Sequence, residues 1–175
     1  MTDHRTTGEY DDDLVHLRRC VQLAAEAVDA GDEPFGSLLV DAAGRVRFED
    51  RNRISGGDAT RHPEFEIARW AAENLAPEER AAATVYTSGE HCPMCSAAHA
   101  LVGLGRIVFA TSGAQYAAWI SDLGAEPGPV AGLSITEVAP GVEVTGPVPE
   151  LAESVRLLHE RSVRAGRNAA PHQPG

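Results

Sequence analysis

The stretch GEHCPMCSAA, residues 89–98, contains two of the chain's three cysteines, with a proline and a methionine between them. Four chemistries use such a spacing: a disulfide, two thiols that fill a core, a redox pair, or half of a metal site. The compartment, the other donors in the chain and the elements that carry them decide among these four. That information lies in the sequence on either side of this stretch.

The composition indicates a single domain outside the membrane. A chain of 175 residues, 43% of them apolar, can form one domain with a substantial core. It has no apolar run of about 18 residues, which argues against a membrane span. The first residues, MTDHRTTGEYDDD, lack the apolar segment of a secretory signal. We therefore expect a cytoplasmic protein, in which a CxxC pair usually serves metal binding or catalysis.

The charge balance argues against nucleic acid as a partner. The chain has 26 acidic and 15 basic residues, which gives a formal net charge of −11. It contains no lysine, and its arginines form no long basic run. Such a surface repels phosphate backbones. The expected partner is therefore a small molecule.

Helical and extended patterns alternate along the chain. The helix expected over residues 14–31 repeats apolar residues at helical spacing and ends at Gly31. Further helices are expected over 62–75, 93–105, 114–124 and 149–166, and strands are expected within 35–50 (two strands), 82–88, 106–112 and 133–139. This alternation predicts an α/β sandwich on one mixed sheet. The expected organisation is a flexible acidic arm (1–12), a single domain (13–167) and a loose tail (168–175).

A metal site needs donors beyond the two closely spaced thiols. Zinc takes four ligands, and catalytic zinc usually takes three from the protein and one from water. The third cysteine, Cys20, lies far away within an expected core helix, so one chain cannot build a site of four cysteines. A site made of Cys92, Cys95 and one histidine remains open. This composition is typical of catalytic sites more than of structural ones.

Seven histidines could supply the third donor. His91 and His99 flank the thiols, and His99 follows Cys95 by one helical turn. His62 differs from the others because Glu64 follows it by two residues at an expected helix start. A carboxylate placed there can transfer protons to and from water without binding the metal itself. The remaining histidines are expected to be surface, packed or terminal residues: His4, His16, His159 and His172.

Short motifs follow one another in a specific order. They are PFG at 34–36, Asn52, D-x-T-x-H-x-E at 58–64, E-x-C-P-M-C at 90–95 and GRIVFA at 105–110. An H-x-E motif followed by C-x-x-C is the signature of zinc deaminases that act on nucleobases. Through these motifs the chain resembles the cytidine deaminase superfamily, and within it the branch of guanine, cytosine and tRNA adenosine deaminases. The resemblance covers roughly residues 14–112.

The resemblance implies a fold, a cofactor and a reaction. The fold would be a three-layer α/β/α cytidine-deaminase-like arrangement with a central mixed sheet of about five strands. Zn²⁺ would be bound by His62, Cys92 and Cys95. Glu64 would be the proton shuttle while water attacks an amino-bearing ring carbon and ammonia departs. Asn52 would hydrogen-bond the base in the pocket.

The other pocket residues combine matches with departures from the family. Phe35 matches a segment that walls the pocket. Pro63 lacks the backbone N–H that relatives often use to bind the base, and His91 replaces the usual proline near the metal, where it could contact substrate. Residues 112–132 match no branch closely, and Leu101 also departs from relatives. The pocket could be completed there by Tyr116, Trp119 and Asp122.

These features together predict a zinc-dependent hydrolytic deaminase of a small aminated nitrogen heterocycle. The CPMC motif slightly favours a guanine-like substrate over cytosine, cytidine or an aminotriazine, and the charge disfavours tRNA adenosine. The resemblance also leads us to expect a homodimer. Two other classes remain open. A non-catalytic zinc module leaves Glu64 and Asn52 unexplained, and a thiol–disulfide oxidoreductase does not need the H-x-E motif.

Overall fold

The computed structural model describes residues 7–166 of the chain. Residues 1–6 of the expected arm and the whole expected tail, 168–175, lie outside this part. The elements are α1 (Thr7–Ala30), β1 (Gly36–Val40), β2 (Val46–Arg51), the 3-10 turn η1 (Ile54–Gly56), α2 (Pro63–Asn74), α3 (Pro77–Ala81), β3 (Thr84–Gly89), α4 (Pro93–Leu101), β4 (Arg106–Thr111), α5 (Gly113–Asp122), α6 (Ile135–Val138), β5 (Val144–Thr145) and α7 (Pro149–Arg164). No helix within residues 7–166 combines the length and apolar character needed to cross a bilayer.

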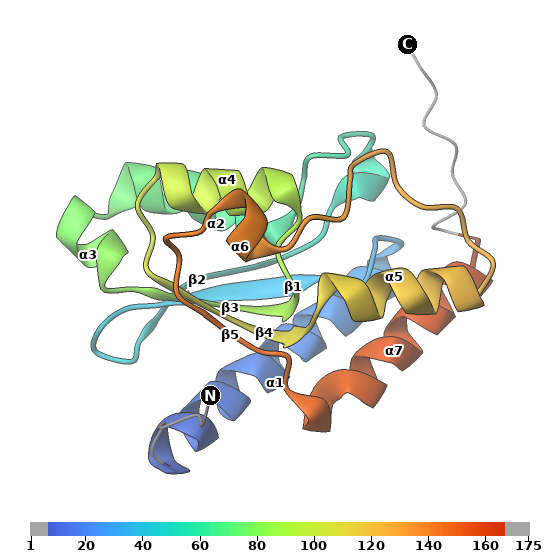
Figure 1. The fold of residues 1–175 in the computed structure, drawn as a ribbon, viewed down its shortest axis with the longest axis horizontal. Helices are drawn as coiled ribbons and strands as arrows, with labels where there is room; N and C mark the ends of the chain where they lie inside the picture. The colour runs from blue at the N-terminus through green and yellow to red at the C-terminus, as the bar shows by residue number, and fades with distance from the viewer. Residues whose placement is uncertain (1–6, 167–175) are drawn as a thin grey trace.

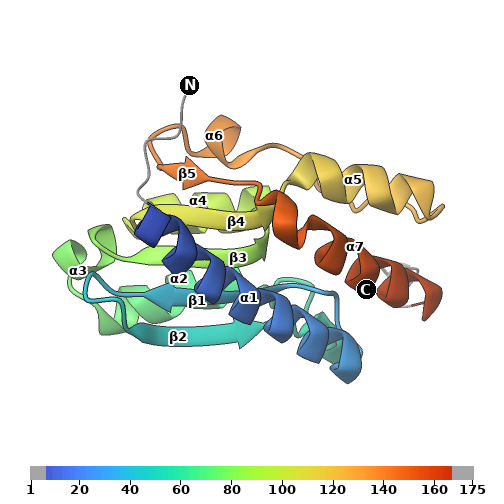
Figure 2. The same cartoon turned by 90° about the horizontal axis from the view of Figure 1, so that it is seen from below.

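The elements form three layers around one mixed sheet. Its strand order is β2-β1-β3-β4-β5. Strand β1 is antiparallel to β2 and β3, whereas β3, β4 and β5 run parallel. Helices α2 and α4 cover one face, with α6 beside α4, while α1 and α7 cover the other face, with α5 beside α7 (Figures 1 and 2). The predicted three-layer α/β/α fold is therefore confirmed.

Strand β1 is buried along its whole length because helices cover both of its faces. Its side chains alternate between two apolar clusters, as the period of a strand requires. Leu38 and Val40 join the cluster on the α1 and α7 side, which includes Leu17. Leu39 joins the cluster on the α2 side, which includes Ile67. The continuous apolar run of β1 thus supplies both halves of the core.

The strand expected over residues 133–139 is wrong. This segment forms the short helix α6, and the last strand is β5, further along the chain. The reason is a capping arrangement in which the carboxylate of Glu137 accepts the backbone N–H of Ser134 at 2.8 Å. The first helical N–H, that of Ile135, is bound by Glu90 at 3.1 Å. These contacts outweigh the extended preference of the β-branched residues in the segment.

Part of the segment expected to be an N-terminal arm is helical. Helix α1 begins at Thr7, so it includes residues 7–12 of that segment. Asp11 and Asp12 in this part are exposed. The hydroxyl of Tyr10 also donates a hydrogen bond of 2.5 Å to Glu150 at the start of α7. This contact ties the first turns of α1 to another helix.

We predict that Gly36→Ala destabilises the fold by about 1–3 kcal/mol through overpacking. A Cβ at Gly36 would lie 2.4 Å from Cβ of Leu23 and 2.5 Å from the carbonyl oxygen of Cys20, because α1 lies directly on β1. Urea denaturation measures the free energy of unfolding. The control is Gly128→Ala, where no atom lies within 4 Å of the new Cβ. Equal stability of the two variants would contradict this close contact.

Candidate active site

Two helix N-termini present the residues of the CxxC pair and the H-x-E motif to each other. His62 is the extended residue before α2, with φ −87° and ψ 138°, and Pro63 is the first helical residue. Cys92 has the same place before α4, with φ −66° and ψ 167°, followed by Pro93. Proline fits this first position because its missing N–H would have no partner within the helix. Cys95 follows in the first turn of α4.

The three side chains form a compact donor set. Sγ of Cys92 lies 3.5 Å from Sγ of Cys95. Nδ1 of His62 lies 3.6 Å from the first sulfur and 3.7 Å from the second. A zinc ion with Zn–S of about 2.3 Å and Zn–N of about 2.0–2.1 Å has tetrahedral edges of about 3.5–3.8 Å. The two sulfurs and one nitrogen therefore fit three corners of a zinc tetrahedron.

The pKa values of the three donors differ because the donors are hydrogen-bonded to one another. Burial alone would lower the pKa of His62, but its hydrogen bond with Cys92 and the charge of Glu64 outweigh burial and raise it to about 9. The hydrogen bond between the two cysteines lowers the pKa of Cys92 to about 4 despite burial. The same hydrogen bond, together with burial, raises the pKa of Cys95. A divalent cation would displace the protons held by His62 and Cys95, because ligands bind metal in their deprotonated forms.

Glu64 lies beside this donor set and is only 5% exposed. Its Oε1 accepts the hydroxyl of Ser37 at 2.8 Å and that of Thr87 at 2.8 Å. Its Oε2 lies 3.7 Å from Sγ of Cys95. Oε1 is thus hydrogen-bonded to two strands of the sheet, and Oε2 faces the donor set.

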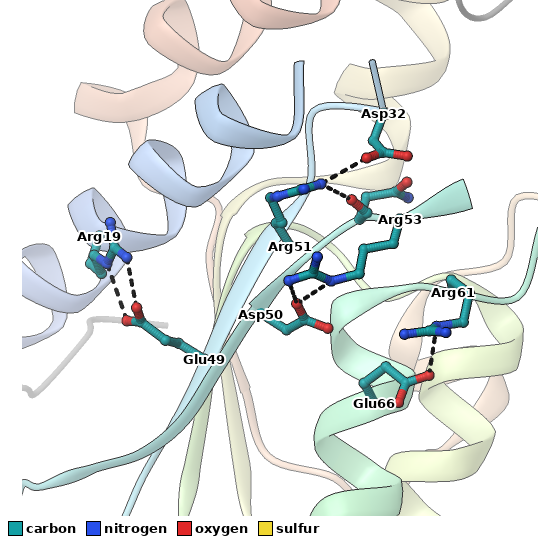
Figure 3. Close-up of polar contacts among 9 residues, drawn as sticks. Arg19, Asp32, Glu49, Asp50, Arg51, Arg53, Arg61 and Glu66 are labelled. Atoms are coloured by element: carbon teal, nitrogen blue, oxygen red, sulfur yellow. Dashed lines mark hydrogen bonds and ion pairs between the residues drawn. The ribbon is translucent and has the colours of Figure 1, made fainter. Parts of the chain in front are cut away.

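The loop between β2 and α2 is fixed by ion pairs at both ends (Figure 3). Near β2, Arg51 pairs with Asp32 at 2.7 Å. The other oxygen of Asp32 accepts the backbone N–H of Ser55 at 2.7 Å. Near α2, Arg61 pairs with Glu66 at 3.2 Å. This loop carries the asparagine and the histidine of the predicted site, so the ion pairs help to position both.

Asn52 is completely buried, and its amide is only half satisfied. Its backbone N–H donates to the carbonyl of Phe35 at 2.9 Å. Its Oδ1 accepts the N–H of Ile54 at 3.1 Å, which fixes the orientation of the amide. Its Nδ2 has no hydrogen-bond partner. An unpaired buried donor is costly, so Nδ2 is suited to bind an acceptor on a ligand.

An aromatic wall made of Phe35, Tyr116, Trp119 and His159 lies next to the end of β3. A Cβ on Gly89 would come within 2.9 Å of the ring of Phe35. The Phe35 ring centroid is 5.7 Å from Tyr116 and 5.2 Å from His159, and Trp119 is 6.0 Å from His159. His159 is 1% exposed, and neither ring nitrogen has a partner. Burial lowers its pKa to about 4, so this imidazole is neutral at neutral pH.

The charge of Glu33 acts on both the aromatic wall and the donor set. Burial raises the pKa of its carboxyl group, and the charges of His62 and Cys92 act on it in opposite directions. Burial also raises the pKa of Tyr116, with a further contribution from the charge of Glu33. The carboxyl group therefore lies within electrostatic range of both groups of residues.

Several predicted residues are not part of this group. His91 is 2% exposed and packs edge-on against His99 at 5.5 Å, so it is not a solvated loop residue. Nε2 of His99 is 2.8 Å from a backbone carbonyl oxygen, and within residues 7–166 only His62, Cys92 and Cys95 form a metal-binding cluster. The predicted substrate contact of His91 stays a prediction. Asp122 is exposed at the end of α5, and its predicted substrate contact likewise stays a prediction.

The sequence analysis missed Ser37, Thr87, Glu33 and His159. Ser37 and Thr87 are polar residues inside buried strands, and the sequence offers no stronger local signal for them. His159 continues the inner stripe of α7 after Leu151 and Val155, at a position where an apolar residue is expected. Such breaks in an apolar pattern mark positions that need a polar partner.

The family comparison agrees with this geometry. The model of the cytidine and deoxycytidylate deaminase zinc-binding region matches residues 11–111. The chain belongs to this family. Its members include hydrolytic enzymes that act on C–N bonds, and the match contains the whole donor set, Glu64 and Asn52.

Individual relatives differ in the substrate that their names give. A probable cytosine deaminase of Schizosaccharomyces pombe is 35% identical over 100 residues, covering 57% of this chain and 60% of that protein. A tRNA-specific adenosine deaminase of Haemophilus influenzae is 31% identical over 113 residues, covering 64% of each chain. The structure of guanine deaminase from Bacillus subtilis is 25% identical with a TM-score of 0.52, covering 91% of this chain and 96% of that one. This chain spans less than two thirds of the curated relatives.

We predict that the purified protein binds stoichiometric zinc through the donor set. Cys92→Ser and Cys95→Ser should each lose most of the metal, because a hydroxyl is a much poorer zinc ligand than a thiolate. Elemental analysis after gel filtration measures the zinc content. Cys20→Ala, in the core, is the matched control and should keep its metal. Equal zinc loss in all three variants would refute this assignment.

Proposed function

We propose that this protein is a zinc-dependent hydrolytic deaminase of small aminated nitrogen heterocycles. The observation that carries the proposal is Oε2 of Glu64, which lies 3.7 Å from a sulfur of the donor set while Oε1 is held elsewhere. A carboxylate in this position can transfer protons without being a ligand. A non-catalytic zinc module would not require a buried carboxylate there.

The reaction is a substitution with no redox step. Zinc bound by the donor set would supply the Lewis-acid chemistry that makes water nucleophilic at neutral pH. Oε2 of Glu64 would take one proton from the attacking water and give it to the ring nitrogen. It would then carry the second proton of that water, from the new C–OH group, to the departing amine. A C–O bond forms, the C–N bond breaks and ammonia leaves. Nδ2 of Asn52 donates to an acceptor on the ring and fixes its orientation.

The charges around the site support a small substrate over tRNA. The arginines nearest the loop between β2 and α2 are engaged with carboxylates: Arg51 with Asp32 and Arg61 with Glu66. Arg53 likewise pairs with Asp50, at 2.9 Å. A groove that binds RNA needs cations that are free to contact phosphates. With a net charge of −11, these pairs favour a neutral heterocycle.

Among small aminated heterocycles, we slightly favour a guanine-like base as the substrate. The support is the CPMC motif and the presence of a guanine deaminase among the relatives of similar fold. The absence of an N–H at Pro63 means that one ring acceptor must be bound by other donors, or must be absent from the substrate. Cytosine, cytidine and aminotriazines remain the alternatives. The predicted homodimer stays a prediction, which sedimentation equilibrium would test.

Ammonia release over a panel of guanine, cytosine, cytidine, adenosine and melamine tests the function. We predict release from at least one free base or small heterocycle by the zinc-loaded protein. Glu64→Gln should lower kcat by about 10²–10⁴-fold, the usual contribution of general acid–base catalysis. Its zinc content should not change, because Glu64 is not a ligand. Loss of zinc in this variant, or an inactive wild-type protein across the panel, would refute the proposal.

A further inference from the structure

Two hydroxyl groups beneath Glu64 are placed there by the register of the sheet. Ser37 of β1 and Thr87 of β3 are direct antiparallel partners, so their side chains lie on the same face. Their oxygens are 2.9 Å apart, and both residues are completely buried. Leu39 and Val85, two residues along each strand, belong to the apolar cluster on the α2 side. The hydroxyls therefore face α2, the helix that carries Glu64.

The contacts of the two hydroxyls with the carboxylate are asymmetric. Both bind Oε1 of Glu64, at 2.8 Å each. Within residues 7–166, the polar contact of Oε2 is with the sulfur of Cys95 at 3.7 Å. Rotation of the carboxylate by half a turn would exchange the oxygens, but any intermediate angle would break both short hydrogen bonds. The pair thus fixes the plane of the carboxylate with one oxygen toward the ligands.

We propose that Ser37 and Thr87 are positioning residues that hold the plane of Glu64 so that one oxygen faces the reacting atoms. This inference rests on the proposed deaminase function. Neither hydroxyl has a polar contact with the donor set. Besides Glu64, the two hydroxyls contact each other, and that of Thr87 also lies 2.9 Å from the carbonyl oxygen of Gly89. Proton transfer is sensitive to the orientation of the carboxylate, because the donor and acceptor must come within hydrogen-bond reach. A loose carboxylate would spend most of its time in unproductive orientations.

A structural role alone has different consequences. A buried carboxylate needs hydrogen-bond donors to remain in the fold, and the two hydroxyls could do no more than meet this need. In that case their removal would lower stability but leave turnover per folded molecule unchanged. If they position the carboxylate, their removal lowers kcat in the folded, zinc-loaded protein. The two roles are thus separated by kinetics on protein of verified metal content.

The first test compares isosteric and conservative variants of Thr87. Thr87→Val keeps the shape but removes the hydroxyl, and kcat should fall about 10- to 100-fold, the effect of one lost hydrogen bond to a charged group. KM should change less than twofold, because the hydroxyl does not touch substrate. Thr87→Ser keeps the hydroxyl and should retain most of the activity. Ser37→Ala should resemble Thr87→Val.

The matched control is Thr111→Val on β4. Thr111 is 1% exposed, and its hydroxyl donates to the carbonyl oxygen of Ser88 at 2.9 Å, away from Glu64. This variant makes the same chemical change at a buried strand position and should leave kcat within about twofold of the wild-type value. If both valine variants lose kcat equally, the loss reports general damage to the sheet, and the proposal is overturned.

A second test needs neither substrate nor metal. The effect of Thr87→Val on the urea midpoint is measured in the wild-type chain and in Glu64→Gln, both without zinc. If the hydroxyl binds the ionised carboxylate, Thr87→Val should shift the midpoint less in the Glu64→Gln background, because a neutral amide loses less when a donor is removed. Equal shifts would show that the two residues are not coupled and would overturn the inference.

The two tests keep this inference distinct from the proposed function. An active wild-type enzyme with an unchanged kcat in Thr87→Val overturns the positioning role and leaves the deaminase proposal intact. An inactive wild-type protein refutes the deaminase proposal and the positioning role with it. The midpoint measurement still decides, in that case, whether the hydroxyls hold the carboxylate.

Discussion

A buried carboxylate beside the sulfur of Cys95 is the constraint on which this structure depends. Burying a charge is costly unless hydrogen bonds compensate, and here they come from the sheet, to the oxygen of Glu64 that does not face this sulfur. The register of β1 against β3 sets where those hydroxyls lie. The packing of α2 against the sheet then brings one oxygen of Glu64 within hydrogen-bond distance of these hydroxyls. Sheet register, helix packing and proton chemistry are therefore linked through one side chain.

The two faces of the sheet differ in the residues that they carry. The face covered by α2 and α4 carries the donor set and Glu64, because both helices begin at the same end of the sheet. The face covered by α1 and α7 is mainly core, with close backbone contact at Gly36. Only beyond the last buried apolar residues of α7 does this face reach the site, through His159 and the aromatic wall.

The sequence predicted those parts of the site that depend on local order. His62, Glu64, Cys92 and Cys95 stand at helix starts, which proline and residue spacing reveal. Their convergence follows from the fold, which the alternation of patterns also predicted. Asn52 was predicted from the family motif. The structure adds that its side-chain nitrogen Nδ2 is a buried donor without a hydrogen-bond partner, which suits it to bind a ligand. The role of Ser37, by contrast, depends on its pairing with Thr87, 50 residues away in the sequence. The segment 133–139 depends on a capping contact with distant Glu90.

The aromatic wall is completed by a residue that is synthesised late. All three metal donors and Glu64 are synthesised by residue 95, whereas His159 comes late, on the last described helix. The donor set is thus complete in the sequence well before the residue that closes the aromatic wall. The site is finished only when α7 packs against β4, α1 and α5.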